Sequence, residues 1–256
     1  MPYLLEVCAD SVRSAVEAQS GGADRIELCS GLVIGGLSPS VAMFEQVKKN
    51  VDIPVRVLLR PRFGDFCYDE YEFETLKEEV RMFRAAGADG VVIGILRPDG
   101  TLDIDRMKTL IECAKSDCGN GNSSCAVTFH RAFDVCRNPY EALRECVQLG
   151  VDTILTSGQK DSAWNGRELL KELAEEAAGK IEILAGAGIN PEVIGKLAGY
   201  AGVTSFHMSG KKVTDSRMEF RREDVPMGIP GFPEFDIWQT DAGQVRQAKQ
   251  ILTALG

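Results

Sequence analysis

Short apolar runs alternate with longer helical patterns along almost the whole chain. Most of these runs are too short for a buried helix and are rich in Val, Ile, Leu and Thr, which favours β-strands. The predicted strands are Leu4–Cys8, Arg25–Cys29, Val55–Leu59, Gly90–Gly94, Ala126–His130, Thr153–Thr156, Glu182–Leu184 and Thr204–Met208. Strands that alternate with helices predict a parallel sheet with right-handed crossovers.

Helical segments fill the intervals between the strands. Three of them open at pairs in which Ser or Asn precedes Pro, because Ser and Asn favour the N-cap and Pro suits the first helical position. These pairs are Ser38-Pro39, with Ser38 as the N-cap, Asn138-Pro139 and Asn190-Pro191. The other predicted helices are Glu70–Ala86, Asp103–Lys115, Gly166–Ala178 and Ala242–Ala254.

A glycine-containing motif recurs before every second strand. It occurs as Gly22-Ala23-Asp24, Gly87-Ala88-Asp89 and Gly150-Val151-Asp152, and in altered form as Ala201-Gly202-Val203. Glycine there can end the preceding helix in the left-handed conformation. The repeat indicates four βαβα units. Eight βα units in 256 residues favour one (β/α)₈ TIM barrel covering residues 1–256 over an open doubly wound sheet.

Two segments interrupt this alternation. Asp117–Ser124 is rich in Gly, Asn and Ser, and we expect a loop on the N-terminal face of the barrel. Lys211–Gln239 contains three prolines and forms a long loop between the last strand and the last helix. Connections of this length are uncommon unless they are functional. We therefore expect a lid over the C-terminal face or a contact between subunits.

Charge and cysteine content narrow the partners and the compartment. The net charge of −9 makes nucleic acid and anionic membrane surfaces poor partners. We expect no signal peptide, because no basic segment precedes a long apolar run at the start of the chain. We expect no membrane span, because no stretch approaches the roughly 20 apolar residues that one needs. Eight cysteines without a CxxC pair in such a chain predict reduced thiols in the cytoplasm.

The first two strands end in the same pattern, with Glu6 and Cys8 on one and Glu27 and Cys29 on the other. Side chains two residues apart on a strand share a face, and adjacent strands lie about 4.8 Å apart. If both pairs face inward, two thiols and two carboxylates converge. Thiolates favour Cu(I) and Zn. The alternative is that both cysteines only pack between strands and helices.

Further polar groups follow the other strands, at the face where such barrels bind and react with ligands. Arg60 and Arg62 after the third strand can clamp an anion, or instead pair with the two glutamates. Small residues after the seventh and eighth strands can bind an anion such as phosphate through backbone N–H groups, or simply form tight turns. These residues are Gly186, Gly188 and Ser209.

Both histidines of the chain stand at strand ends, His130 after the fifth and His207 in the eighth. His130 precedes Arg131, and Asp134 follows four residues beyond it. A histidine near a carboxylate can serve as a general acid or base. The alternative is that each histidine is a packing residue.

Between Leu5 and about Phe220 the chain resembles the CutC family. The matching motifs are Leu5–Cys8, Gly21–Cys29, Gly35–Ser40, Arg60–Arg62 with Gly64–Phe66 and Tyr68, Thr128–Asp134, Ile154–Gly158 and Phe206–Ser209. The resemblance implies a cytoplasmic barrel, often oligomeric, that is linked to copper homeostasis and binds copper. It implies that Cys8 and Cys29 are the copper ligands.

Two functions follow as hypotheses. The first is a copper homeostasis protein that binds Cu(I) through the paired cysteines. The second is a TIM-barrel enzyme that acts on a small anionic or phosphorylated metabolite and is only indirectly linked to copper. Its candidate groups are Glu6, Glu27, His130 and His207 for acid–base chemistry, Asp134 beside His130, and Arg60 and Arg131 as an electrophilic clamp.

Overall fold

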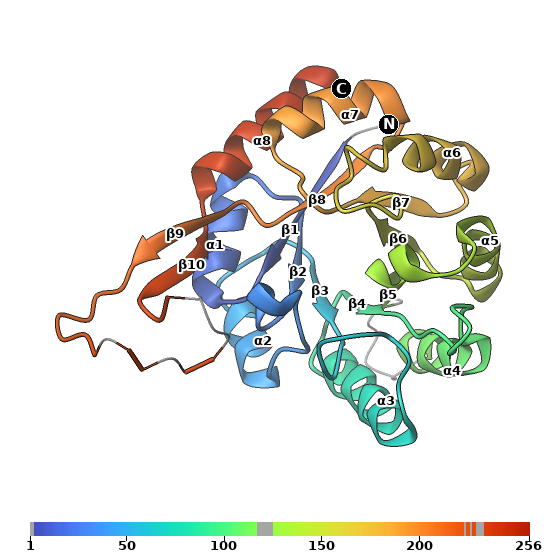
Figure 1. Ribbon diagram of the computed structural model, residues 1–256, viewed down its shortest axis with the longest axis horizontal. Coiled ribbons are helices and arrows are strands. Elements are labelled where there is room, and N and C mark those ends of the chain that lie inside the picture. Colours follow the sequence, from blue (N-terminus) through green and yellow to red (C-terminus); the bar gives the residue numbers. More distant parts are fainter. Residues whose placement is uncertain (1–2, 117–124, 223, 226, 229–232) are drawn as a thin grey trace.

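Eight parallel strands close into a barrel that eight helices surround (Figure 1). This computed structural model describes residues 3–116, 125–222, 224–225, 227–228 and 233–256. The strand order follows the chain from β1 to β8, and β8 pairs with β1. The predicted (β/α)₈ barrel is therefore confirmed. The predicted loop at Asp117–Ser124 lies outside the described residues.

The elements agree with the predicted pattern to within a few residues. The barrel strands are β1 (Leu4–Ala9), β2 (Arg25–Leu28), β3 (Val55–Leu58), β4 (Gly90–Ile93), β5 (Ala126–Phe129), β6 (Thr153–Thr156), β7 (Glu182–Ala185) and β8 (Ser205–Met208). The helices are α1 (Val12–Gly21), α2 (Val41–Lys48), α3 (Glu70–Ala85), α4 (Ile104–Lys115), α5 (Pro139–Leu149), α6 (Arg167–Ala177), α7 (Pro191–Ala201) and α8 (Ala242–Leu255). None of these helices is both long and apolar enough to cross a membrane.

Helix starts and ends follow local side-chain chemistry, with one correction. Asn138 and Asn190 each accept a backbone N–H bond as N-caps of α5 and α7. The prediction of Ser38 as an N-cap is wrong, because Ser40 caps α2. The Ser38 hydroxyl instead accepts the backbone N–H of Arg60 at 2.9 Å, which ties the start of this helix to the end of β3. Gly22 and Gly150 end their helices in the left-handed conformation, as the repeat predicted.

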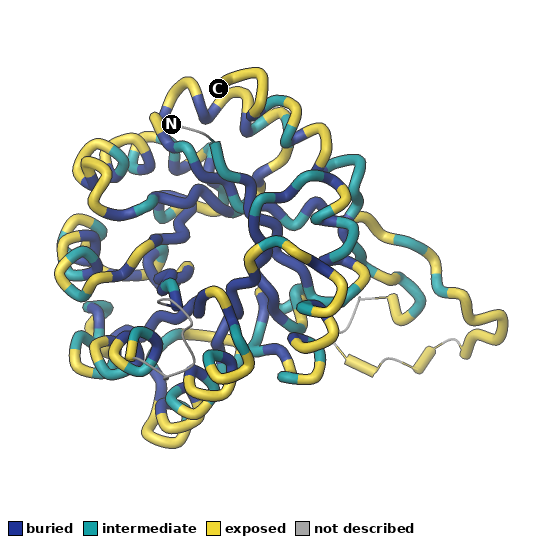
Figure 2. The backbone as a smooth tube through the Cα atoms, turned by 180° about the vertical axis from the view of Figure 1, so that it is seen from behind, coloured by how far each residue is buried: buried dark blue, intermediate teal, exposed yellow. Residues whose placement is uncertain are grey.

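The main hydrophobic core lies between the strands and the surrounding helices. Alternate strand residues such as Leu5, Val7, Ile26 and Leu28 are fully buried. Figure 2 shows the same layering, with buried residues along the strands and exposed residues on the outer sides of the helices. The other alternating set points into the barrel and carries the polar groups described below, because side chains two apart on a strand share a face.

Charged side chains fill the barrel interior toward the N-terminal ends of the strands. The guanidinium of Arg25 forms an ion pair with Glu6 and lies 3.4 Å from Glu182. Arg56 donates to the hydroxyls of Thr128 and Thr153 at 2.7 and 2.8 Å. The two arginines and two glutamates balance in charge beneath the site, with Arg25 paired to both glutamates and Arg56 bonded to the two hydroxyls.

The connection after β8 contains regular structure that the sequence did not predict. Strands β9 (Lys211–Asp215) and β10 (Asp236–Thr240) pair in an antiparallel ribbon, which extends away from the barrel beside α1 (Figure 1). The expectation of a plain long loop is therefore corrected. Bonds at the base of the ribbon hold it to the barrel, including one from the backbone N–H of Asp241 to the carbonyl of Gly210 at 2.7 Å.

Candidate functional site

A cavity of about 410 Å³ opens at the C-terminal ends of the barrel strands. Nine of the residues singled out from the sequence line it, namely Cys8, Glu27, Cys29, Arg60, His130, Arg131, Gly188, His207 and Ser209. Four others do not line it, namely Glu6, Arg62, Asp134 and Gly186. The cavity is therefore lined by seven of the eight barrel strands or the segments that follow them, with Leu155 contributing from β6. Of the four remaining residues, Glu6 still contacts the cavity residue His207.

The register between β1 and β2 determines which groups face each other. Glu6 lies opposite Arg25, and Cys8 lies opposite Glu27. The two Glu-x-Cys patterns are therefore shifted by two residues relative to each other, so that the two glutamates do not lie side by side. As a result Glu6 sits deeper, in an ion pair with Arg25, whereas both cysteines reach the cavity.

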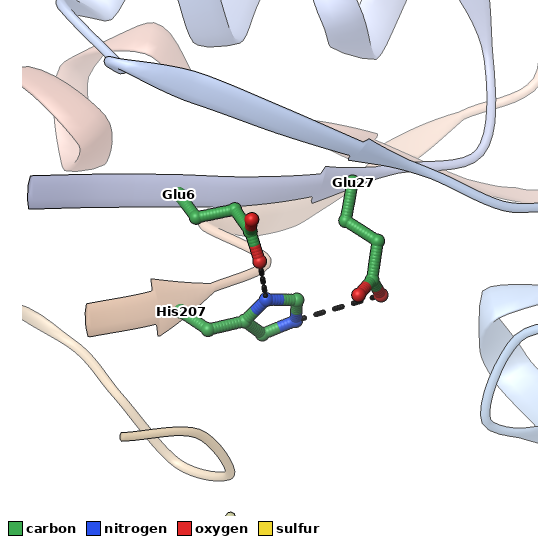
Figure 3. Close-up of side chains that lie close together, drawn as sticks. All are labelled: Glu6, Glu27 and His207. Carbon is green, nitrogen blue, oxygen red and sulfur yellow. Dashed lines mark hydrogen bonds and ion pairs between the residues drawn. The ribbon is translucent and has the colours of Figure 1, made fainter. Parts of the chain in front are cut away.

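His207 lies between two carboxylates, as Figure 3 shows. Its Nδ1 is 2.7 Å from Glu6, and its Nε2 is 4.0 Å from Glu27. Burial alone would lower the pKa of His207, but the neighbouring Cys8 and Glu27, together with Glu6, raise it well above the ordinary value. The imidazole is therefore held as a cation between the two acids.

The two glutamates differ in protonation because their neighbours differ. Burial opposes ionisation of Glu6, yet the adjacent Arg25 and His207 lower its pKa to about 2. Burial raises the pKa of Glu27 to about 7, since it has no ion pair as close as that of Glu6. Two acids in one site that separate in this way can take different roles in proton transfer.

His130 is a neutral imidazole in the opposite wall of the cavity. Its Nδ1 accepts the backbone N–H of Ala132 at 3.1 Å, which caps the short 3₁₀ helix Arg131–Val135. Burial, with the nearby charge of Arg60, lowers its pKa to about 3. The proton of the neutral ring therefore resides on Nε2, which finds no hydrogen-bond partner among the described residues.

The two arginines after β3 have separate surroundings. Arg60 donates to the carbonyls of Gly64 at 2.7 Å and Gly36 at 3.3 Å, and its guanidinium carbon lies 4.9 Å from the centre of the Phe66 ring. Its Nε lacks a partner within the described residues. The idea that these arginines pair with Glu6 and Glu27 is wrong, because Arg25 is the partner of Glu6.

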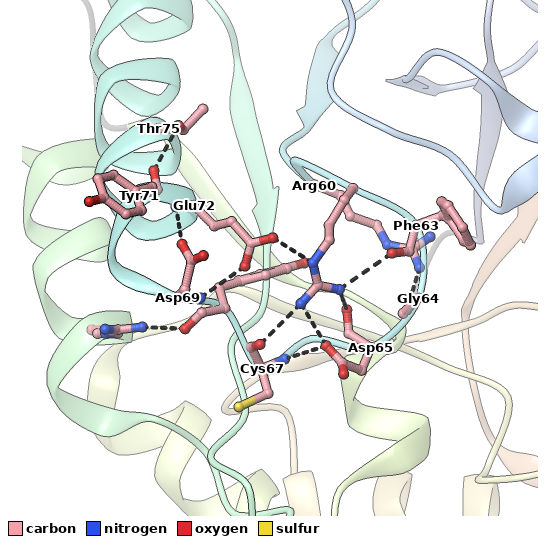
Figure 4. A network of polar contacts seen from close by, with 12 residues as sticks. Arg60, Phe63, Gly64, Asp65, Cys67, Asp69, Tyr71, Glu72 and Thr75 are labelled. Carbon is pink, nitrogen blue, oxygen red and sulfur yellow. Dashed lines mark hydrogen bonds and ion pairs between the residues drawn. The ribbon is translucent and has the colours of Figure 1, made fainter.

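Arg62 anchors the loop that carries Phe66, and Figure 4 shows its partners Asp65, Cys67 and Glu72. It forms an ion pair with Asp65 at 2.9 Å, donates to the carbonyl of Cys67 at 3.1 Å and pairs with Glu72 of α3. Since these partners occupy its donors outside the cavity, Arg62 shapes the wall of the site instead of facing it.

Asp134 and Gly186 also have local structural partners. Asp134 accepts the backbone N–H of Ser157 at 2.9 Å and pairs with Arg131 at 2.6 Å, so it joins the ends of β5 and β6 instead of contacting His130. A side chain at Gly186 would come within 2.6 Å of Leu155. The absence of a side chain there serves close packing.

The two thiols are buried beside backbone carbonyls. The sulfur of Cys8 lies 3.6 Å from the carbonyl of Met208, and that of Cys29 lies 3.6 Å from the carbonyl of Ala9. Burial and the nearby Cys8 raise the pKa of Cys29 well above its ordinary value. No disulfide joins any of the seven cysteines in the described part of the chain.

Sequence reasoning missed three residues that shape the site. Arg25 pairs with Glu6, Phe66 packs against both Arg60 and His130, and Lys211 lines the cavity at the start of the ribbon. Period-two alternation could have found Arg25, because it shares a face with Glu27. Nothing in the local pattern marks Phe66 or Lys211.

The fold and the cavity define a (β/α)₈-barrel protein whose C-terminal mouth carries thiols, carboxylates, imidazoles and guanidinium groups. The family model described as CutC family matches residues 3–212, and the chain belongs to this family.

Curated relatives extend the match over nearly the whole chain. It is 42% identical over 250 residues to the human copper homeostasis protein cutC homolog, covering 97% of this chain and 89% of that protein. It is 42% identical over 256 residues to a family protein CutC from Bacteroides fragilis (strain YCH46), covering 99% and 97%.

Solved structures agree with the fold. A crystal structure of a CutC protein from Streptococcus agalactiae matches with a TM-score of 0.75 at 26% identity, covering 81% of this chain and 98% of that one. N-(5'-phosphoribosyl)anthranilate isomerase from Pyrococcus furiosus matches with a TM-score of 0.56 at 13% identity, covering 98% and 99%. The second likeness shows the barrel fold alone.

Proposed function

We propose that this protein serves copper homeostasis by binding Cu(I) through the thiols of Cys8 and Cys29. The observation that carries the proposal is that both buried thiols, from neighbouring strands, line one cavity. The human and mouse relatives are both named copper homeostasis protein cutC homolog. Working in the cytoplasm would keep both thiols reduced.

The donor set suits a soft monovalent metal. Cu(I) favours thiolate ligands. Each thiol now lies 3.6 Å from a backbone carbonyl, and because sulfur is a weak hydrogen-bond partner, exchanging these contacts for bonds to the metal costs little. Binding requires both thiols to lose their protons. The cationic His207 and Arg60 line the same cavity and would offset the negative charge of a dithiolate complex.

We expect the Cys8→Ser/Cys29→Ser variant to lose more than about 100-fold in Cu(I) affinity. Losing both ligands should cost more affinity than changing the groups that surround a metal site. The measurement is an anaerobic Cu(I) titration against a competing chelator. Since hydroxyls replace thiols of similar size, circular dichroism should report an intact fold.

The matched control is Cys67→Ser/Cys113→Ser, which removes two half-buried thiols that do not line the cavity. It should bind Cu(I) as the wild type does. Equal losses in both double variants, or tight binding retained without Cys8 and Cys29, would contradict the proposal.

A further inference from the structure

Two hydrogen-bond donors in the wall of the cavity have no partner among the described residues. They are Nε of Arg60 and Nε2 of His130. Both residues line the cavity, and they are only 9% and 3% exposed. A buried donor without an acceptor destabilises the fold, and an acceptor on a ligand in the cavity would supply the missing partner.

Both donors are held in place by the other atoms of the same side chains. The terminal nitrogens of Arg60 bond to the carbonyls of Gly36 and Gly64, and Nδ1 of His130 accepts the N–H of Ala132. The ring of Phe66 lies against both, with its centre 4.9 Å from the guanidinium carbon and 4.7 Å from the imidazole centre. Fixed donors of this kind bind a ligand without further loss of side-chain freedom.

The charges at this wall favour an anion. Within the described residues the guanidinium of Arg60 donates only to backbone carbonyls, so no carboxylate offsets its positive charge. His130 remains neutral, because burial and Arg60 lower its pKa to about 3, and it therefore keeps its Nε2 proton to donate. Lys211 adds positive charge to the lining of the same cavity, whereas the charge of Arg131 is offset by its ion pair with Asp134.

We propose that Arg60 Nε and His130 Nε2 form a binding site for an oxyanion group, a carboxylate or a phosphate, of a small metabolite. The cavity volume of about 410 Å³ falls in the range of small-molecule sites. This site goes beyond copper binding, since neither thiol takes part in it. It gives the anionic-metabolite hypothesis raised by the sequence a defined pair of donors.

Calorimetric titration of the metal-free, reduced protein with inorganic phosphate and, separately, with malonate tests the proposal. We expect saturable binding of at least one probe, and the probe that binds identifies phosphate or carboxylate as the preferred group. Arg60→Gln and His130→Asn should each weaken that binding by about 10- to 100-fold, the value of one charge-assisted hydrogen bond. Asn at position 130 can still accept the N–H of Ala132, so this variant retains the helix cap.

The matched control is Arg144→Gln, an equal change of charge on the outer side of α5, where the arginine is 57% exposed. It should leave the affinity within about twofold of the wild type, as expected for a remote surface charge. The titration uses metal-free protein, so failure of copper binding and failure of anion binding are separate results. No saturable binding of either probe, or equal affinities in wild type, Arg60→Gln and His130→Asn, overturns the proposal.

Discussion

Arg25→Met is expected to lower the free energy of unfolding by about 3–5 kcal/mol, the cost of breaking a buried ion pair from one side. Arg25 is only 6% exposed, and its guanidinium contacts Glu6 and Glu182 inside the barrel. Methionine fills similar space but leaves the buried Glu6 carboxylate with His207 as its one remaining close ionic partner among the described residues. The midpoint of urea unfolding, analysed with an unchanged m-value, measures the loss.

Two further variants make this result specific. Arg13→Met removes an exposed arginine that pairs with Glu17 on α1, and it should cost no more than about 0.5 kcal/mol. Adding Glu6→Gln to Arg25→Met should recover part of the stability, because the buried carboxylate that lost Arg25 is then no longer charged. A loss for Arg25→Met as small as that for Arg13→Met would show that the interior ion pair is not a major source of stability.

His130 should make the protein less stable in mild acid, by up to about 1.4 kcal/mol for each pH unit below 6.5. Burial and Arg60 lower its pKa from 6.5 to about 3 in the folded protein. Between these values the unfolded chain binds a proton that the folded chain does not, so stability falls as pH falls. Glu27, whose pKa is raised to about 7, acts in the opposite direction over part of this range.

Because these contributions oppose each other, the informative quantity is the difference in stability between wild type and His130→Asn. We expect the free energy of unfolding of the wild type, relative to that of His130→Asn, to fall by about 2 kcal/mol as the pH is lowered from 7.5 to 5. His207→Asn provides a control of opposite sign, since the pKa of His207 is raised and its protonated form stabilises the fold at low pH. A pH-independent difference for His130→Asn would mean that His130 is not held neutral.

Sequence periodicity was sufficient to predict the barrel, because each strand and helix has a recognisable pattern in its own residues. The Asn-Pro pairs at 138 and 190 act within one helical turn, and the structure confirms them as helix starts. The assignment of Ser38 failed because its hydroxyl bonds to Arg60, a partner 22 residues away. The ribbon was missed because its strands flank the proline-rich part of the connection, and that part dominated the composition of the segment.

The site was predictable as a set of strand-end residues but not as a set of contacts. Alternation correctly placed Cys8 and Glu27 on the inner face, whereas the register that sets Cys8 opposite Glu27 depends on how the whole barrel closes. The same limit applies to Arg62, whose ion pairs with Asp65 and Glu72 turn its charge away from the cavity. Pairing between strands and loops is a tertiary property that no local pattern encodes.

The β9–β10 ribbon concentrates the risk of aggregation in one place. A closed barrel has no edge strands, so within the described residues the only sheet edges able to accept another chain belong to the ribbon. Val213 and Ile237 expose apolar surface near its middle, while Lys211, Lys212 and Asp215 place charges along β9. Charged residues on an edge strand oppose the addition of a further strand. The ribbon is therefore protected by its own charges, and neutralising Lys212 and Asp215 would weaken this protection without changing a residue that lines the cavity.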